Sequence, residues 1–185
     1  MKNYNSKEII DQMLGLGYKI PDFHLVGIRS KNSVPDKFDD PFYIFENYGM
    51  VDGPMWCTTN PGKHWLNNLL NPRGAALLKP GQYINTWKIG QHQGKYTALV
   101  QAKPVTVYRD KDLDDLAEVT DYEETGLFGI NIHRANEGLT SILIGKWSAG
   151  CQVLANPTDF AKLMSRVGFH SHDHTLFTYT LLDEW

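Results

Sequence analysis

The sequence predicts a β-rich α+β domain, and three observations lead to that class. The chain has 185 residues, which suits one hydrophobic core and is short for two. Short apolar segments of strand length recur along it, bounded by Gly, Pro, Asn or Asp, the residues that form tight turns. Only two segments combine helical periodicity with capping residues. We therefore expect residues 1–185 to form a single domain around a mostly antiparallel sheet.

The first expected element is an N-terminal helix. Asn5 or Ser6 can cap it, and Glu8 lies in its first turn. The helix should dock on the core through one apolar face, made of Ile9, Ile10, Met13 and Leu14. Strand signals follow at 23–29, 42–45, 54–59, 83–89, 97–102 and 105–109.

Two longer segments interrupt the strands. Residues 60–81 are rich in Pro, Gly and Asn, and a loop of this kind could wall a substrate groove. Residues 110–125 gather acidic side chains and predict a solvated face or a short helix. A second helix is expected at 157–167, with Asn156 as its cap and Pro157 in its first turn, and a final strand at 176–182.

The composition is that of an ordinary globular protein, with 42% hydrophobic and 21% charged residues. A formal net charge of -3 gives no basic footprint, so we expect neither nucleic acid nor an anionic membrane as a partner. The N-terminus lacks the apolar core of a secretory signal, and no run approaches about eighteen apolar residues, so we expect no membrane span. We predict a cytoplasmic protein at synthesis, unless it leaves by a route that the sequence does not encode.

The most informative motif lies within residues 129–153. The run G-I-N-I-H-R is followed by K-W-S-A-G-C-Q-V, which places Cys151 eighteen residues after His133. At the ends of two adjacent strands, these side chains could meet as nucleophile and base, and the histidine could lower the thiol pKa. Gly150 permits an unusual turn and Ser148 adds a hydroxyl and an amide, so both are candidates for an oxyanion-stabilising pocket. Taken alone, a cysteine such as Cys151 is more often a small buried hydrophobe. The distant Cys57 predicts no disulfide framework.

These residues resemble the catalytic domain of L,D-transpeptidases. The signature of that family is a histidine on one strand and, about fifteen to twenty residues later, S-H-G-C with the cysteine as acyl-forming nucleophile. His133 matches the histidine, and Ser148, Gly150 and Cys151 match the later motif. The resemblance covers roughly residues 50–155, with a weaker likeness at 58–62 and 74–83. It implies a mixed β-sheet or sandwich with flanking helices.

The sequence departs from that signature at two places. Ala149 stands where the family has the second histidine, and Gln152 and Val153 stand where it has an arginine that binds a substrate carboxylate. Arg134 could supply that positive charge, although strand alternation would point it away from the face of His133. The run W-S-A-G-C also resembles proteins found in phages and prophages, which implies degradation of the cell wall rather than cross-linking.

Other candidate residues surround this motif. His92 lies between two glycines near a strand end, where it could line the site or be an exposed hairpin residue. We also place Gln152 and Trp147 in substrate binding, and for Trp147 packing is the stronger expectation. A separate run, F-H-S-H-D-H, would place three histidines on one face if it were extended, as a zinc site needs. We favour an exposed polar turn for these residues, which are His170, His172 and His174.

The sequence therefore predicts a cysteine peptidase that cleaves the stem peptide of peptidoglycan through a thioester, acting on the cell wall after release, with no cofactor and no metal. An L,D-transpeptidase that forms or exchanges cross-links is the first alternative. A non-catalytic module that binds peptidoglycan or belongs to a virion is the second. The bond that is cut and the oligomeric state stay open.

Overall fold

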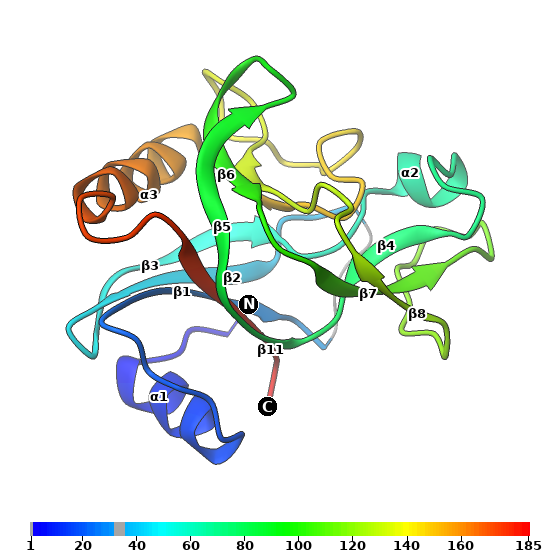
Figure 1. Cartoon of the computed structure of the whole chain (residues 1–185). Coiled ribbons are helices and arrows are strands. Elements are labelled where there is room, and N and C mark those ends of the chain that lie inside the picture. The colour runs from blue at the N-terminus through cyan, green and yellow to red at the C-terminus, as the bar shows by residue number, and fades with distance from the viewer. Residues whose placement is uncertain (1, 32–35) are drawn as a thin grey trace.

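The computed structural model describes residues 2–31 and 36–185. Eight strands form a closed barrel, and three further strands form a small second sheet beside it (Figure 1). This architecture is β-rich, with a large mixed sheet and a small one, and it is compatible with the predicted α+β class.

The barrel is built mainly from antiparallel neighbours, as the turn-bounded strand signals indicate. Its strands, in spatial order, are β1 (Phe23–Arg29), β11 (Phe177–Asp183), β5 (Gly81–His92), β6 (Tyr96–Gln101), β9 (Ile132–Arg134), β10 (Gln152–Leu154), β3 (Gly49–Thr58) and β2 (Asp40–Glu46). Two neighbouring pairs run parallel, β1 with β11 and β10 with β9. The second sheet has the order β4 (Ala75–Leu78), β7 (Val105–Asp110) and β8 (Glu123–Gly126).

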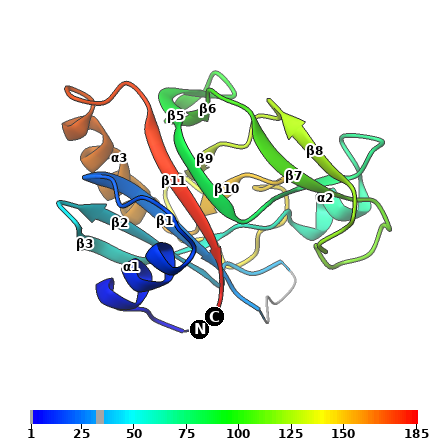
Figure 2. The same cartoon turned by 60° about the horizontal axis from the view of Figure 1, so that its bottom comes forward.

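Three helices accompany the sheets. The first, α1 (Ser6–Gly15), has the predicted capping box between Asn5 and Glu8, and it packs Ile9 and Met13 on an apolar cluster with side chains of β1 and β2. The longest, α3 (Pro157–His170), lies on another side of the barrel, as the two views show (Figures 1 and 2). The short α2 (Lys63–Asn67) lies near the second sheet, away from α1.

One large apolar cluster unites the two sheets and α3. Trp87 of β5 is fully buried, and its indole N–H donates to the Ile130 carbonyl at 2.7 Å. Leu78 of β4 and Val107 of β7 belong to the same cluster as Trp87, and so does Leu163 of α3. The second sheet is therefore packed on the barrel by the same hydrophobic burial that closes the barrel.

A buried polar cluster fixes the place where β1, β2 and β3 meet the second sheet. Arg29 donates through Nε to the Thr59 hydroxyl at 3.0 Å and through Nη2 to the carbonyls of Thr59 and Leu78. Asp40 accepts from the amide and the hydroxyl of Thr59, both at 2.7 Å. Because a buried ion is costly without hydrogen bonds, this triad of Arg29, Thr59 and Asp40 depends on each of its members.

The predicted elements are present with shifted ends, and the differences lie in the short strands. The segment predicted as a loop at 60–81 contains α2 and β4, and the acidic segment 110–125 ends in β8 without forming a helix. Strands of three or four residues give little periodic signal, which is why β4 and β8 were not predicted. Among the described residues, every helix is too short or too polar to cross a bilayer.

Replacing Thr59 tests the buried triad. Thr59→Val keeps the shape and the backbone amide but removes the hydroxyl between Arg29 and Asp40, and we expect a loss of about 1–3 kcal/mol in the free energy of unfolding. Urea denaturation followed by fluorescence measures it. The matched control is Thr97→Val on the exposed face of β6, which should stay within about 0.5 kcal/mol of the parent. Equal stability of both variants would contradict the role given to the triad.

Candidate active site

The parallel pairing of β9 and β10 brings the predicted motif together. Val153 stands opposite His133 in the register, and the Gln152 amide donates to the Asn131 carbonyl at 2.9 Å. Side chains alternate along a strand, so Asn131 and His133 share one face, and Cys151 and Val153 share the same face of the neighbouring strand. The predicted meeting of a histidine strand with a cysteine strand is therefore present in the fold.

The turn before Cys151 is held by Ser148 and Gly150. The Ser148 hydroxyl donates to the Cys151 carbonyl at 2.8 Å and accepts from the Gly150 amide at 3.2 Å. Gly150 has φ of 122°, and a Cβ there would lie 2.3 Å from the Ala76 carbonyl oxygen, so only glycine fits. Ser148 is fully buried and thus positions the turn, and the Gly150 amide is already occupied.

The Cys151 thiol occupies a backbone cradle. Its sulfur accepts from the Asn131 amide at 3.5 Å and donates to the Gly129 carbonyl at 3.4 Å. The surrounding protein raises the pKa of the Cys151 thiol to about 11 by burial, and the Asn131 hydrogen bond only partly opposes this. The expectation that His133 lowers the thiol pKa is therefore corrected, because burial dominates.

His133 is held as one neutral tautomer. Its Nδ1 lies 2.8 Å from the Arg134 carbonyl oxygen, an acceptor only, so Nδ1 carries the proton and Nε2 keeps a lone pair. Nε2 is buried and has no hydrogen-bond partner among the described residues, Cys151 included. Burial lowers the pKa of His133 to about 3, and its neighbour His92 adds to the effect. Two neutral groups, thiol and imidazole, thus share one face of the sheet.

A second histidine stacks on the first. The rings of His92 and His133 lie 3.9 Å apart, and His92 is the acceptor of a hydrogen bond from the Asn131 side chain at 3.0 Å. The Gln101 amide donates to Asn131 Oδ1, which fixes the Asn131 amide group with its NH₂ toward His92 Nδ1. Neutral His92 therefore carries its proton on Nε2. Its pKa is lowered by burial and by Lys95.

Two cavities meet at His92. One, of about 670 Å³, is lined by Cys151, Ala149 and Asn131 together with apolar residues of the 65–76 segment and of 127–130. The other, of about 420 Å³, is lined by His133, Tyr96, Trp147, Lys95 and Lys146. His92 and Gln93 line both cavities. His92 is thus buried beside both cavities rather than exposed in a hairpin.

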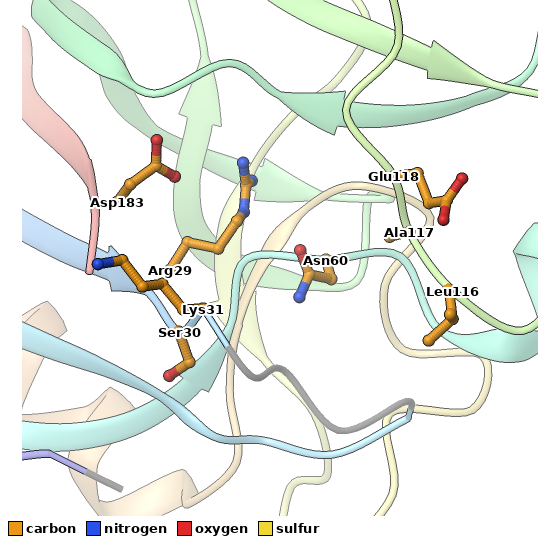
Figure 3. Close-up of a pocket in the computed structure, with 8 residues that line it drawn as sticks. All are labelled: Arg29, Ser30, Lys31, Asn60, Leu116, Ala117, Glu118 and Asp183. Carbon is orange, nitrogen blue, oxygen red and sulfur yellow. The ribbon is translucent and has the colours of Figure 1, made fainter. Parts of the chain in front are cut away.

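A third cavity, of about 550 Å³, lies apart from this motif near Arg29, Asn60 and Asp183 (Figure 3). The view shows Arg29 and Asp183 on one side and Glu118 pointing away from them on the other. Arg29 lines this cavity, and its Nη1 is buried with no hydrogen-bond partner among the described residues.

Trp147 and Arg134 were both predicted to bind substrate, and they differ in placement. Trp147 is 43% exposed on the wall of the second cavity, where a flat ring is available to a ligand. The Arg134 guanidinium lies 4.3 Å from the centre of the Tyr96 ring and pairs with Glu137 at 3.4 Å. Arg134 lines neither cavity, so it does not supply the positive charge that the sequence assigned to it.

Gln152 was also predicted to bind substrate, and the structure places it elsewhere. Its side chain is fully buried, where it accepts from the Tyr179 hydroxyl at 2.9 Å and approaches the Gly150 carbonyl. Strand alternation explains the placement, because a residue next to an outward-facing cysteine faces the interior. We therefore assign Gln152 to the barrel interior rather than to substrate.

The C-terminal histidines do not share an extended strand. His170 is the last residue of α3 and stacks on Phe23 at 4.2 Å, whereas His172 is exposed in the turn that follows. His174 approaches Asp22 at 3.7 Å. In the described part of the chain, no three His, Cys, Asp or Glu side chains are grouped as a metal site requires.

Four residues of the site were not predicted from the sequence. Asn131 and Tyr96 orient the two histidines, and Arg73 and Arg109 line the larger cavity. Asn131 could have been found by alternation, since it stands two residues before His133. The other three come from distant segments that only the fold brings together.

Comparison of the chain with family models, curated proteins and solved structures gives no match. The geometry of the site therefore carries the functional assignment.

Alkylation with iodoacetamide tests the state of Cys151. Because the thiolate is the reactive form and the pKa lies near 11, the rate should rise about tenfold per pH unit from pH 6 to pH 9.5 without a plateau. Mass spectrometry should find the label on Cys151 and not on Cys57, which is fully buried. The control Cys57→Ala should label as the parent does. A plateau below about pH 8 would show an activated thiolate and contradict the neutral pair.

Proposed function

We propose that this protein is a cysteine peptidase that cleaves the stem peptide of peptidoglycan through a thioester. One observation carries the proposal. A half-buried Cys151 lines a large cavity, and the adjacent parallel strand holds a neutral His133 with an unpaired Nε2 on the same face. Nucleophile and base on one rigid surface are what acyl transfer to sulfur requires.

The chemistry follows from the groups present. Cys151 Sγ attacks the carbonyl carbon of the substrate amide, and its proton passes to Nε2 of His133. The tetrahedral intermediate then expels the amine, which takes that proton, and leaves a thioester on Cys151. Water attacks the thioester, with His133 accepting a proton, and releases a carboxylic acid and the free thiol. The Cys151 amide, which has no partner among the described residues, is the donor available to the oxyanion.

Both groups are neutral at rest, so ionisation accompanies attack rather than precedes it. The thiol now donates to the Gly129 carbonyl, and in the proposed mechanism it turns from that carbonyl toward His133. Nε2 of His133 is an acceptor without a donor, and burying such an atom costs free energy until the thiol pairs with it. Rotation of the thiol toward Nε2 of His133 is therefore favoured, and Nε2 is the atom that accepts the proton in the proposed reaction.

Two features support peptidoglycan as the substrate. The residues His133, Ser148, Gly150 and Cys151 match the L,D-transpeptidase signature, and they come together on β9 and β10 and the turn before β10. The larger cavity offers apolar walls together with charged and amide groups, which suits a peptide rather than an apolar ligand.

The presence of a second cavity favours one alternative, an L,D-transpeptidase. That cavity adjoins His133, where an acceptor amine could replace water. However, its charged lining consists of Lys95 and Lys146 without an acidic residue. Positive charges disfavour a protonated amine and leave water unaffected, so hydrolysis is the outcome that we propose.

Cys151→Ala tests the nucleophile. Digestion of defined muropeptides by the parent should release hydrolysed peptides that mass spectrometry identifies, and Cys151→Ala should release none because the thioester cannot form. Cys57→Ala is the control and should keep its activity, since Cys57 is fully buried on β3.

Three other results of this digestion experiment would each lead to a different conclusion about the function. Turnover by Cys151→Ala would reject the mechanism. Cross-linked products in the presence of excess amine would favour the transpeptidase. Binding without any product would favour the non-catalytic module.

His133→Gln tests the base. Loss of general base help should lower kcat/KM by about 10²–10⁴. The pH profile of Cys151 alkylation should stay unchanged, because no hydrogen bond joins the two residues at rest. The exposed His172→Gln is the control. If His133→Gln stays active while His92→Gln does not, the base is His92.

A further inference from the structure

The cavity that contains Cys151 has an unusual charged lining. Arg73 and Arg109 line it, and no Asp or Glu does so among the described residues. The whole chain has a net charge of -3, so this local excess of positive charge is not a general property of the surface. The remaining walls are largely apolar and include Trp65, Leu127 and Phe128.

A single carboxylate behind the cavity wall joins the two arginines. Glu124 of β8 accepts from Arg73 Nη1 at 2.7 Å and from Arg109 Nε at 2.8 Å. Two positive charges share one negative charge, so one is left uncompensated. A guanidinium has five N–H donors, and these contacts use only some of them.

The two arginines differ in freedom. The Arg109 side chain is 4% exposed, donates through Nη1 to the Gly74 carbonyl at 3.2 Å and lies 4.7 Å from the Phe128 ring centre. The Arg73 side chain is 53% exposed and has Glu124 as its ion-pair partner. Arg109 is thus a fixed positive charge, while Arg73 can turn part of its fork toward a ligand without breaking the core.

We infer that this cavity selects acyl donors that carry a free carboxylate, with Arg73 as the residue that binds the carboxylate and Arg109 as its fixed support. The inference rests on the proposed function, because it names the class of peptide that Cys151 attacks. A carboxylate accepts two parallel N–H bonds from a guanidinium, and an amide at the same place cannot match that charge.

Binding to an inactive variant tests this inference without requiring turnover. Calorimetry on Cys151→Ala compares two synthetic stem tetrapeptides, one with free α-carboxylates and one with those groups converted to carboxamides. The acid form should bind about tenfold to a hundredfold more tightly, the range for a hydrogen bond to a charged group. Adding Arg73→Gln should reduce that ratio to about threefold or less and leave the carboxamide peptide unchanged.

The matched control is Arg166→Gln on α3. Arg166 is a partly exposed arginine, 44% exposed in its side chain, paired with Glu46 on another part of the surface, and its loss should leave the ratio intact. Equal affinity for both peptides, no binding of either, or an unchanged ratio in the Arg73→Gln variant would overturn the inference.

Turnover by the active parent separates the two proposals. Equal cleavage of both peptides would reject the inference and keep the peptidase. Arg73-dependent binding of the acid form, with cleavage of neither peptide, would keep the selectivity and reject the peptidase.

Discussion

The pairing of β9 with β10 is the contact on which the rest of the site depends. Both strands have three residues, yet they close the barrel between β6 and β3. Strands this short are held by what surrounds them: Ala135 and Ala155 extend the hydrogen bonds at their ends, and Ser148 fixes the turn that leads into β10. Because the pairing is parallel and in register, it sets both which face His133 presents and where Cys151 stands. A shift of one residue would turn either side chain into the barrel.

The same burial that closes the barrel determines the chemistry at rest. Dense protein around the site raises the thiol pKa of Cys151 and lowers the imidazole pKa of His133, so each group stays neutral. A thiolate–imidazolium ion pair would need further hydrogen bonds to its charged atoms. The groups around it already form their hydrogen bonds with the backbone. What the site provides instead is orientation, because the Arg134 carbonyl fixes the tautomer of His133, and Asn131 fixes that of His92. In the proposed reaction, an acceptor whose orientation is already fixed would need less reorganisation.

The sequence predicts the individual helices and strands better than it predicts how the strands pair to close the barrel. Capped helices and alternating strands follow from local periodicity, and Gly150 is recognisable because the turn before Cys151 needs a residue without Cβ. The adjacency of His133 and Cys151 was predicted from their spacing and a family resemblance. The position of Arg109 could not be predicted, because its place beside the cavity depends on the pairing of β4 with β7, in which Arg109 stands opposite the distant Ala76. Gln152 was misplaced for a simpler reason, since alternation along β10 puts it inside the barrel.

The charged residues that line the two cavities all carry positive charge. The larger cavity is lined by Arg73 and Arg109, the smaller by Lys95 and Lys146, and neither has an acidic lining residue among the described ones. In the proposed reaction, positive charge in the cavity of Cys151 and in the neighbouring cavity of His133 would favour the negative charge that develops on the oxyanion and on the sulfur during attack. The same charges would attract the acidic donor that we propose and repel an ammonium acceptor. The lysines are exposed, so salt weakens their part, whereas the buried Arg109 keeps its influence. In the proposed site, salt should therefore weaken the repulsion of amines and the contribution of the exposed Arg73, while the contribution of the buried Arg109 to donor selection persists.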